Sequence, residues 1–251
     1  MKPAWSRPID TTNSYPNVWL EFNAKESKNS DRIIKYRIQD LPEDRFDDAI
    51  QHIIDDFLLD APITKFFGAA TNKKYVEDYL RSCRWKLPNK TTLVCFREGS
   101  DEIVGLNVTY VSVKNDPFWQ EVTFAAQTDE YKDHMTITRL LRANVDIFEK
   151  YKVDKYLGCI CLSVAQAYRG LNIGQRLLEA REPLCKALDI RVTQSLFVSD
   201  NSNHIADKVG FKIDSQYTMD ELSEIYPKIP FKQFDAKIFA VKSWNFQKIN
   251  A

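Results

Sequence analysis

LSVAQAYRGLNIGQRLL, residues 162–178, is the most informative segment of the sequence. The run that leads into it, Tyr156–Val164, is apolar and β-prone, which predicts a strand. Leucines recur at helical spacing between residues 177 and 188, which predicts a helix after it. The segment therefore predicts a strand, a tight loop and the start of a helix.

The loop between these two elements is suited to an anion. Gly170, Asn172 and Gly174 tolerate positive φ, so successive backbone N–H groups can turn toward one point. The first turn of the helix adds its unpaired N–H groups and the positive end of its dipole. A pyrophosphate would be held there by backbone groups, with Arg169 adding a charge-assisted contact.

Two well-known phosphate loops do not match. The chain has no G-x-x-x-x-G-K-[ST] motif, so a Walker-type NTPase is not expected. It has no G-x-G-x-x-G motif, so a dinucleotide-binding Rossmann unit is not expected either. What remains is R-x-x-[G/N]-x-[G/A] directly after a strand that ends in Leu-Ser-Val.

That pattern resembles the acyl-CoA loop of the GCN5-related N-acetyltransferase (GNAT) superfamily, [Q/R]-x-x-G-x-[G/A]. Arg169 takes its first position, Asn172 its middle glycine and Gly174 its last position. A strand over 192–198 and the segment 199–211 after it resemble the closing helix of that superfamily, with its Lys-x-Gly-Phe turn.

Within the superfamily, YRGL at 168–171 and LPED at 41–44 resemble the insect arylalkylamine N-acetyltransferases, and the resemblance spans residues 33–241. It implies an α/β (α+β) fold whose mixed, mostly antiparallel central sheet is flanked by helices on both faces. It also implies direct transfer of acetyl from acetyl-CoA to a primary amine in a ternary complex. The expected acceptor is an arylalkylamine such as dopamine, octopamine, tryptamine or serotonin.

The same resemblance assigns the cofactor-binding residues. The backbone of Leu162, Ser163 and Val164 is expected to contact the pantetheine arm of acetyl-CoA. The residues expected to hold the pyrophosphate are Arg169, Gly170, Leu171, Asn172, Ile173, Gly174 and Gln175.

The general base of the insect enzymes is missing from its usual place. Arylalkylamines titrate near the lysine side chain, so the amine must lose a proton before it attacks. The family's Glu-Pro-Leu triplet corresponds here to 61–63, and its first residue is Ala61. Asp60 is the nearest replacement, and the alternative is that Asp60 is a solvated carboxylate at a helix end.

Ser202 is the candidate acid, because it matches the second serine of a pair that the insect enzymes carry in the closing helix. The first serine of that pair corresponds to Val198, and the tyrosine acid found more widely in the superfamily corresponds to Ala206. The alternative for Ser202 is a helix-capping or helix-surface hydroxyl.

Other chemistry-bearing residues predict no further centre. His52, His134 and His204 are all expected on solvated helix surfaces, and no pair has metal-ligand spacing, so no metal is expected. Alternation places Cys159, Cys161 and Ser163 on one face of the central strand. Phe66 and Phe67 could line an aromatic amine pocket or pack in the core.

Composition describes one enzyme-sized domain. The 251 residues carry 35 Lys plus Arg against 35 Asp plus Glu, so neither nucleic acid nor an anionic membrane is an expected partner. Five cysteines without a C-x-x-C pair and without a secretory signal favour reduced thiols and the cytoplasm. We expect an N-terminal arm over 1–30, a single acetyltransferase domain over 31–251, and a monomer whose partners are acyl-CoA and a small amine.

Hydrophobic periodicity predicts the remaining elements. The expected strands are 33–38, 91–97, 102–113, 213–219 and 236–241, and the expected helices are 42–59, 72–83 and 133–151. Residues 115–127 are expected to be irregular. Two functional alternatives stay open: a GNAT enzyme for another amine (a polyamine or amino acid) or a longer acyl donor, and a CoA-binding homologue with weak or no catalysis.

Overall fold

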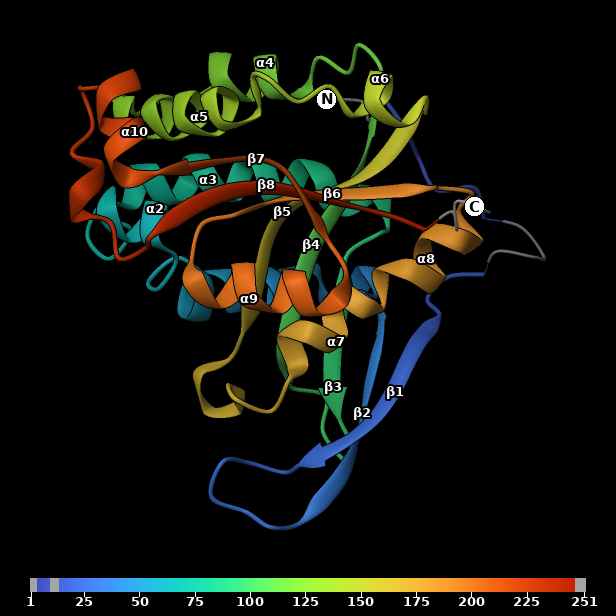
Figure 1. The fold of residues 1–251 in the computed structure, drawn as a ribbon. Coiled ribbons are helices and arrows are strands. Elements are labelled where there is room, and N and C mark those ends of the chain that lie inside the picture. Colours follow the sequence, from blue (N-terminus) through green and yellow to red (C-terminus); the bar gives the residue numbers. More distant parts are fainter. Residues whose placement is uncertain (1–3, 10–13, 247–251) are drawn as a thin grey trace.

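One eight-stranded sheet organises the molecule (Figure 1). It is seen in a computed structural model that describes residues 4–9 and 14–246. Residues 1–3 and 10–13 of the expected arm and residues 247–251 of the expected domain therefore lie outside the described residues. The strands are β1 Val18–Lys25, β2 Ile33–Asp40, β3 Leu93–Arg97, β4 Ile103–Val113, β5 Lys155–Val164, β6 Val192–Phe197, β7 Lys212–Thr218 and β8 Ile238–Asn245. Their order is β1-β2-β3-β4-β5-β6-β8-β7, and all neighbours are antiparallel except β5 and β6. The predicted mixed, mostly antiparallel sheet is confirmed.

Helices cover both faces of the sheet. They are α1 Phe46–His52, the π-helical turn η2 Ile53–Phe57, α2 Pro62–Phe66, α3 Lys73–Lys86, α4 Phe118–Phe124, α5 Asp129–Arg142, α6 Ile147–Tyr151, α7 Ile173–Glu179, α8 Arg181–Ala187, α9 Asp200–Val209 and α10 Met219–Ile225. Figure 1 shows α5 and α10 on one side of the sheet and α7, α8 and α9 on the other. Separate hydrophobic clusters fill the two sides, one built on α1, α3 and α5 and one on α7 and α8.

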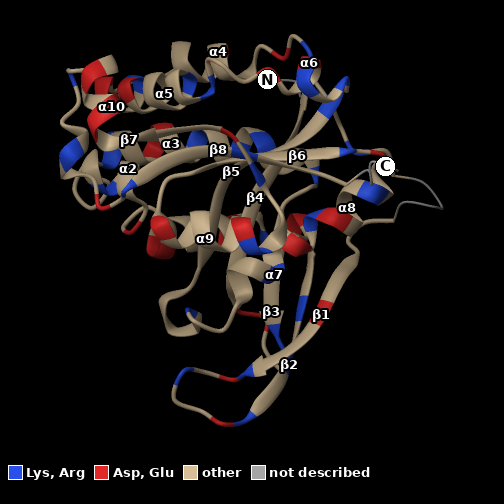
Figure 2. Ribbon diagram, viewed as in Figure 1, with Lys and Arg blue, Asp and Glu red and all other residues tan. Residues whose placement is uncertain are grey.

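Charge is spread over the whole fold. Figure 2 shows acidic and basic residues interspersed on helices and strands of both layers. Within the described residues, none of the helices combines the length and apolar composition needed to cross a bilayer.

The segment expected to be an arm contains an edge strand that the sequence analysis did not predict. Strand β1 pairs with β2, and Phe22 stacks on Tyr36 with ring centroids 5.3 Å apart. The register shifts between Val18 and Leu20, which breaks the two-residue alternation that reveals a strand. Ahead of it, Arg7 forms a fully buried ion pair with Asp40 at 2.9 Å, which fastens the chain to β2.

Two of the predicted elements were wrong. The expected single helix 133–151 is two helices, because Asp146 caps α6 by accepting a hydrogen bond from Glu149 N at 3.1 Å. The expected irregular segment 115–127 contains α4. The other expected strands and helices lie within a few residues of their predicted bounds.

A bulge in β5 shapes the middle of the sheet. Opposite β4, Cys161 pairs with Val108 and Cys159 pairs with Thr109, so Ile160 is an extra residue in β5. Such a bulge bends its strand. On the other side, the described β5–β6 pairing consists of Leu157 opposite Thr193, and the strands part beyond it.

The bulge also overturns the expectation that Cys159 and Cys161 share one face. Cys161 packs in the cluster on the α3 side. Cys159 instead receives a hydrogen bond on Sγ from Asn107 Nδ2 at 3.2 Å, and Asn107 binds Arg181 of α8. One extra residue reverses the alternation.

Candidate active site

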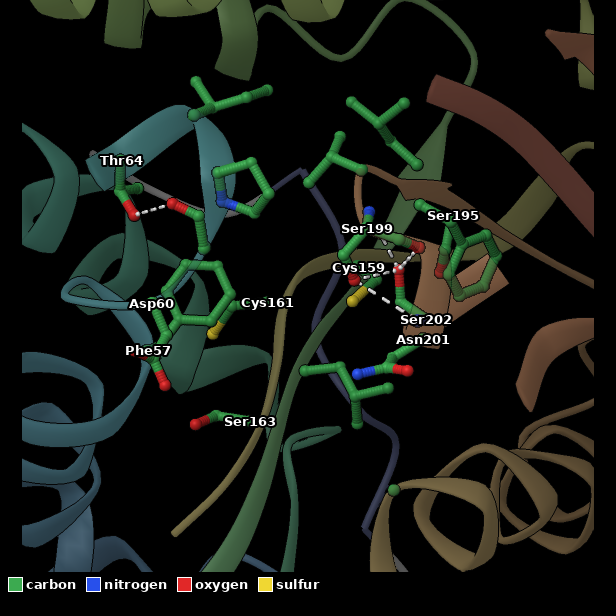
Figure 3. Close-up of a pocket in the computed structure, with 18 of the residues that line it drawn as sticks. Phe57, Asp60, Thr64, Cys159, Cys161, Ser163, Ser195, Ser199, Asn201 and Ser202 are labelled. Carbon is green, nitrogen blue, oxygen red and sulfur yellow. Dashed lines mark hydrogen bonds between the residues drawn. The ribbon is translucent and has the colours of Figure 1, made fainter. Parts of the chain in front are cut away.

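A cavity of about 1050 Å³ lies where β5 and β6 part. Its walls are 159–164 of β5, 195–202 of β6 and α9, residues 168–170 and 172–175 of the loop, and the inner faces of α2, α3 and α5. Leu171, expected to hold the pyrophosphate, is not among the lining residues. Figure 3 shows Phe57, Asp60 and Ser163 on one side and Ser195, Ser199 and Ser202 on the other. The cavity therefore brings together the loop, the strand and the closing helix that the sequence singled out.

The loop has the backbone geometry of an anion site. Gly170 and Asn172 have φ of 86° and 64°, both in the left-handed region. Asn172 O accepts the first helical bond of α7 from Arg176 N at 3.0 Å, so the N–H groups of 173–175 precede the helical ladder. The side chain of Asn172 does not cap this end, which leaves those N–H groups for a ligand.

Gly174 lies where a larger residue would be tightly packed. A Cβ atom there would lie 3.3 Å from Ile205 Cδ1 of α9 and 3.7 Å from Val164 Cγ2. The glycine therefore lets α7 approach α9 and β5 closely, and this places the loop at the end of the parted strands.

Arg169 and Asp60, predicted for different roles, are bound to each other. They form an ion pair, while Arg169 Nε donates to Val164 O at 3.0 Å and Nη2 donates to Asp56 O at 3.2 Å. The guanidinium thus joins the loop to η2 and to the segment that follows it, as a clamp. The carboxyl of Asp60 is 54% exposed and lines the cavity beside this clamp.

Ser202 lies on the cavity wall and caps its own helix. Ser202 Oγ donates to Ser199 O at 2.9 Å, and Ser202 N donates to Ser199 Oγ at 3.2 Å. With Ser199 N these contacts form a capping box at the start of α9. Ser202 therefore makes the contacts of a helix-capping hydroxyl, which was the alternative to its role as the acid. It also lies on the cavity wall, where the acid would have to be.

The predicted pantetheine strand borders the cavity along its length. Leu162, Ser163 and Val164 all line it. Ser163 Oγ is buried and has no hydrogen-bond partner among the described residues. An unsatisfied buried hydroxyl is costly, and an amide-rich chain lying along β5 would satisfy it, so these residues fit the pantetheine arm.

The helical side of the cavity is an aromatic chamber. One face of α5 lines it at helical spacing, through Tyr131, His134, Met135, Thr138 and Arg142. Aromatic side chains from other elements complete it, namely Phe66, Tyr79, Trp119 and Phe234. Phe67 is not among its lining residues and stacks on His134, with ring centroids 6.2 Å apart.

The expectation that His134 is exposed was wrong. It is buried, and its Nδ1 lies 2.8 Å from Tyr75 Oη. Burial, with a smaller contribution from the Arg142 charge, lowers the pKa of His134 to about 3. The helix starts at residue 129, with Thr128 as its cap, so His134 lies in its second turn on the face that lines the cavity.

The other two histidines differ from each other. His52 was expected to be solvated and is buried, which lowers its pKa, while the Asp56 carboxylate at 3.5 Å opposes that shift. His204 is exposed on α9, as expected, at the cavity edge.

We predict a pH-dependent stability that originates at His134. The pKa of His134 in the folded protein lies below its ordinary value, so between about pH 6.5 and pH 3 the unfolded chain binds one more proton than the folded protein. The free energy of unfolding therefore decreases as the pH is lowered through this range. Between about pH 7 and pH 5 this should cost about 2 kcal/mol of unfolding free energy. Urea titrations should show that loss reduced by this amount in His134→Gln, whereas His204→Gln should behave as wild type. Equal pH dependence in all three proteins would contradict the assignment.

Comparison with known proteins agrees with this geometry. No protein-family model and no curated protein sequence matches the chain. Among solved structures, it is similar to the protein named arylalkylamine N-acetyltransferase 7 of the yellow fever mosquito, with 33% sequence identity and a TM-score of 0.89. The match covers 97% of this chain and 100% of that one.

More distant structures share the fold. Arylalkylamine N-acetyltransferase 2 of Aedes aegypti is 17% identical with a TM-score of 0.73, and the polyamine N-acetyltransferase of Drosophila melanogaster is 14% identical with a TM-score of 0.66. Each match covers 84% of this chain and 99% of the other. The long match at 33% identity establishes the relationship: this chain belongs to the insect arylalkylamine N-acetyltransferase family of the GNAT superfamily.

Proposed function

We propose that this protein transfers the acetyl group of acetyl-CoA to a primary arylalkylamine of the dopamine, octopamine, tryptamine or serotonin type. The observation that carries the proposal is one continuous cavity that joins an anion-binding loop, a gap between two strands and an aromatic chamber. These parts match the pyrophosphate, the thioester arm and an aromatic amine in that order. We further propose that the enzyme works as a cytoplasmic monomer.

Each part of the cavity has a role in this proposal. Backbone N–H groups of residues 169–175 hold the pyrophosphate, with the Arg169 clamp keeping the loop in place. The backbone of 162–164 binds the pantetheine arm, as a strand binds an extended peptide. Asp60 takes the amine proton through water, and Ser202 donates toward the leaving sulfur once its bond to Ser199 O opens.

The transfer is tested by thiol release from acetyl-CoA across a panel of amines at several pH values. Asp60→Asn retains a hydrogen bond to Arg169 but removes the basic carboxylate. We expect it to lower kcat about 10- to 100-fold near neutral pH, with KM for acetyl-CoA nearly unchanged. Asp55→Ala, an exposed carboxylate nearby, is the matched control and should keep full activity.

The outcomes separate the parts of the proposal. Full rate and an unchanged pH profile in Asp60→Asn would remove Asp60 as the base and leave the transfer intact. Acetyl-CoA binding without turnover on any amine would favour a non-catalytic CoA-binding homologue. Loss of acetyl-CoA binding altogether would contradict the enzyme reading.

The charge inside the chamber supports a monoamine over a polyamine. Arg142 lines the chamber, where Nε lies 3.4 Å from Gln194 Oε1, and no ion pair joins it to a carboxylate within the described residues. Its guanidinium repels a second ammonium group of the acceptor and can donate to a distal oxygen. The chamber therefore suits an aromatic monoamine with a phenolic or other polar ring substituent.

We predict that Arg142→Glu reduces the preference of the enzyme for monoamines over polyamines. The ratio of kcat/KM for tyramine to that for spermidine should fall by about 10-fold or more, because reversing the charge changes repulsion into attraction. Arg139→Glu, one turn earlier on α5 and outside the chamber lining, is the control and should leave the ratio unchanged. Equal ratios in wild type and Arg142→Glu would contradict the role of Arg142.

A further inference from the structure

Arg181 is a buried cation surrounded by neutral groups. It opens α8 and its side chain is 0% exposed. Its Nε donates to Asn107 Oδ1 at 2.8 Å, and its Nη1 donates to Ser195 Oγ at 2.7 Å and to Thr193 Oγ1 at 3.1 Å. Its Nη2 is buried with no hydrogen-bond partner among the described residues, and no described carboxylate lies within ion-pair distance of the group.

Such a charge is expensive to keep. A guanidinium remains protonated at any physiological pH, so it cannot escape burial by losing its proton. Burying a charge without a counter-ion is strongly unfavourable even after the surroundings relax, and neutral side chains could join these strands at lower cost. The arrangement is explained if a negative charge forms beside it during function.

The location is the gap between the parted strands. Arg181, Ser195 and Cys159 all line the cavity, and Thr193 belongs to the last pair that joins β6 to β5. Figure 3 shows Ser195 and Cys159 on the same side of the pocket as Ser199 and Ser202. Through Asn107 the network also reaches Cys159 Sγ at 3.2 Å, so it touches both strands that border the gap.

Ser195 is the member that can contact a ligand. Its Oγ accepts from Arg181, and the hydrogen of its own hydroxyl has no acceptor among the described residues. Ser202 differs, because its hydroxyl already donates to Ser199 O. Ser195 thus presents a donor toward the gap with a permanent cation behind it.

We propose that Ser195 and Arg181 stabilise the thiolate of CoA as it leaves, which rests on the proposed binding of acetyl-CoA in this cavity. The amine nitrogen forms a bond to the acetyl carbon, the carbon–sulfur bond breaks, and sulfur keeps the electron pair. Ser195 donates a hydrogen bond to that sulfur as the charge develops, without giving up its proton, and Ser202 is the acid that protonates the thiolate afterwards, once its bond to Ser199 O opens. Arg181 stays protonated and supplies the field, while the amine proton leaves through Asp60 and water. Ser195 is then a catalytic residue and Arg181 a positioning residue.

The test measures ionisation of the thiol in the complex with CoA, the reaction product. Thiolate absorbs in the ultraviolet, so a pH titration of the bound complex reports its pKa without any turnover. In wild type this pKa should lie about one unit or more below that of free CoA. In Ser195→Ala and Arg181→Gln the pKa of the bound thiol should rise most of the way back to that of free CoA. In Arg181→Lys part of the lowering should remain. Arg191→Gln, a surface arginine that donates to Lys152 O at 2.8 Å, is the matched control.

Kinetics provide a second readout that a purely structural role would not move. Ser195→Ala should lower kcat about 10-fold while KM for acetyl-CoA stays within about threefold, because the contact forms as charge develops on sulfur. Thermal unfolding of Arg181→Gln shows whether that variant folds, and Ser195→Ala carries the test if it does not.

The results distinguish this inference from the proposed function. Binding of CoA with the same thiol pKa in wild type, Ser195→Ala and Arg191→Gln would overturn the inference and leave the transferase reading standing. Failure of the wild type to bind CoA would overturn both.

Discussion

Replacing Asn172 with valine is expected to weaken acetyl-CoA binding about 10- to 100-fold. Residue 172 has φ of 64° and is the last residue before α7. A β-branched side chain strains this conformation by about 1–3 kcal/mol, so the loop would rearrange and turn its N–H groups away from the pyrophosphate. Calorimetric titration with acetyl-CoA measures the effect directly.

Asn172→Gly is the matched control. Glycine adopts the same conformation without strain and is the residue that the superfamily pattern has here. It should bind acetyl-CoA within about threefold of wild type. Equal affinity of the valine and glycine variants would show that the left-handed conformation at 172 does not matter for binding.

The largest expected effect on stability is at Asp78. Its buried carboxylate accepts hydrogen bonds from Gln127 N, Thr128 N and Thr128 Oγ1, the last at 2.7 Å, and pairs with Arg81. Asp78→Ala leaves these donors without their acceptor at the start of α5. We expect it to lower the unfolding free energy by about 3–5 kcal/mol.

Chemical denaturation measures this loss. Glu130→Ala, an exposed acid in the first turn of the same helix, should leave the unfolding midpoint unchanged. Because α5 forms one wall of the chamber, Asp78→Ala should also raise KM for the amine more than KM for acetyl-CoA. A loss of stability no larger than that of Glu130→Ala would contradict the role of Asp78 as the acceptor at the start of α5.

The parts of the structure that could be predicted from the sequence are those with local contacts. The strand–loop–helix unit around residues 162–178 could be predicted because its strand, its positive-φ residues and its helix are encoded within one short segment. The same holds for the hairpin of β3 and β4. Phe66 was a candidate for the chamber and does line it, but the wall made by α5 escaped prediction, because it depends on where that helix begins. Thr128 followed by two acidic residues was the available signal for α5.

The remainder depends on contacts between distant segments. The bulge at Ile160 is defined by the register of β5 against β4, and periodicity within one strand cannot reveal it. The pairing of Arg169 with Asp60 links residues more than a hundred positions apart, so the sequence could nominate each for a role but could not show that they meet. The buried setting of Arg181 is equally non-local, because its acceptors come from β4 and β6.

Acetyl-CoA is proposed to lie in the gap between β5 and β6 with its pyrophosphate on the loop before α7. A crystal structure of the acetyl-CoA complex would show this placement. We predict pyrophosphate oxygens within hydrogen-bond distance of the backbone N–H groups of Gly174 and Gln175, and the thioester sulfur between Cys159 and Ser195. A pyrophosphate bound elsewhere, or β5 and β6 closed against each other with the ligand outside, would rule out this binding mode.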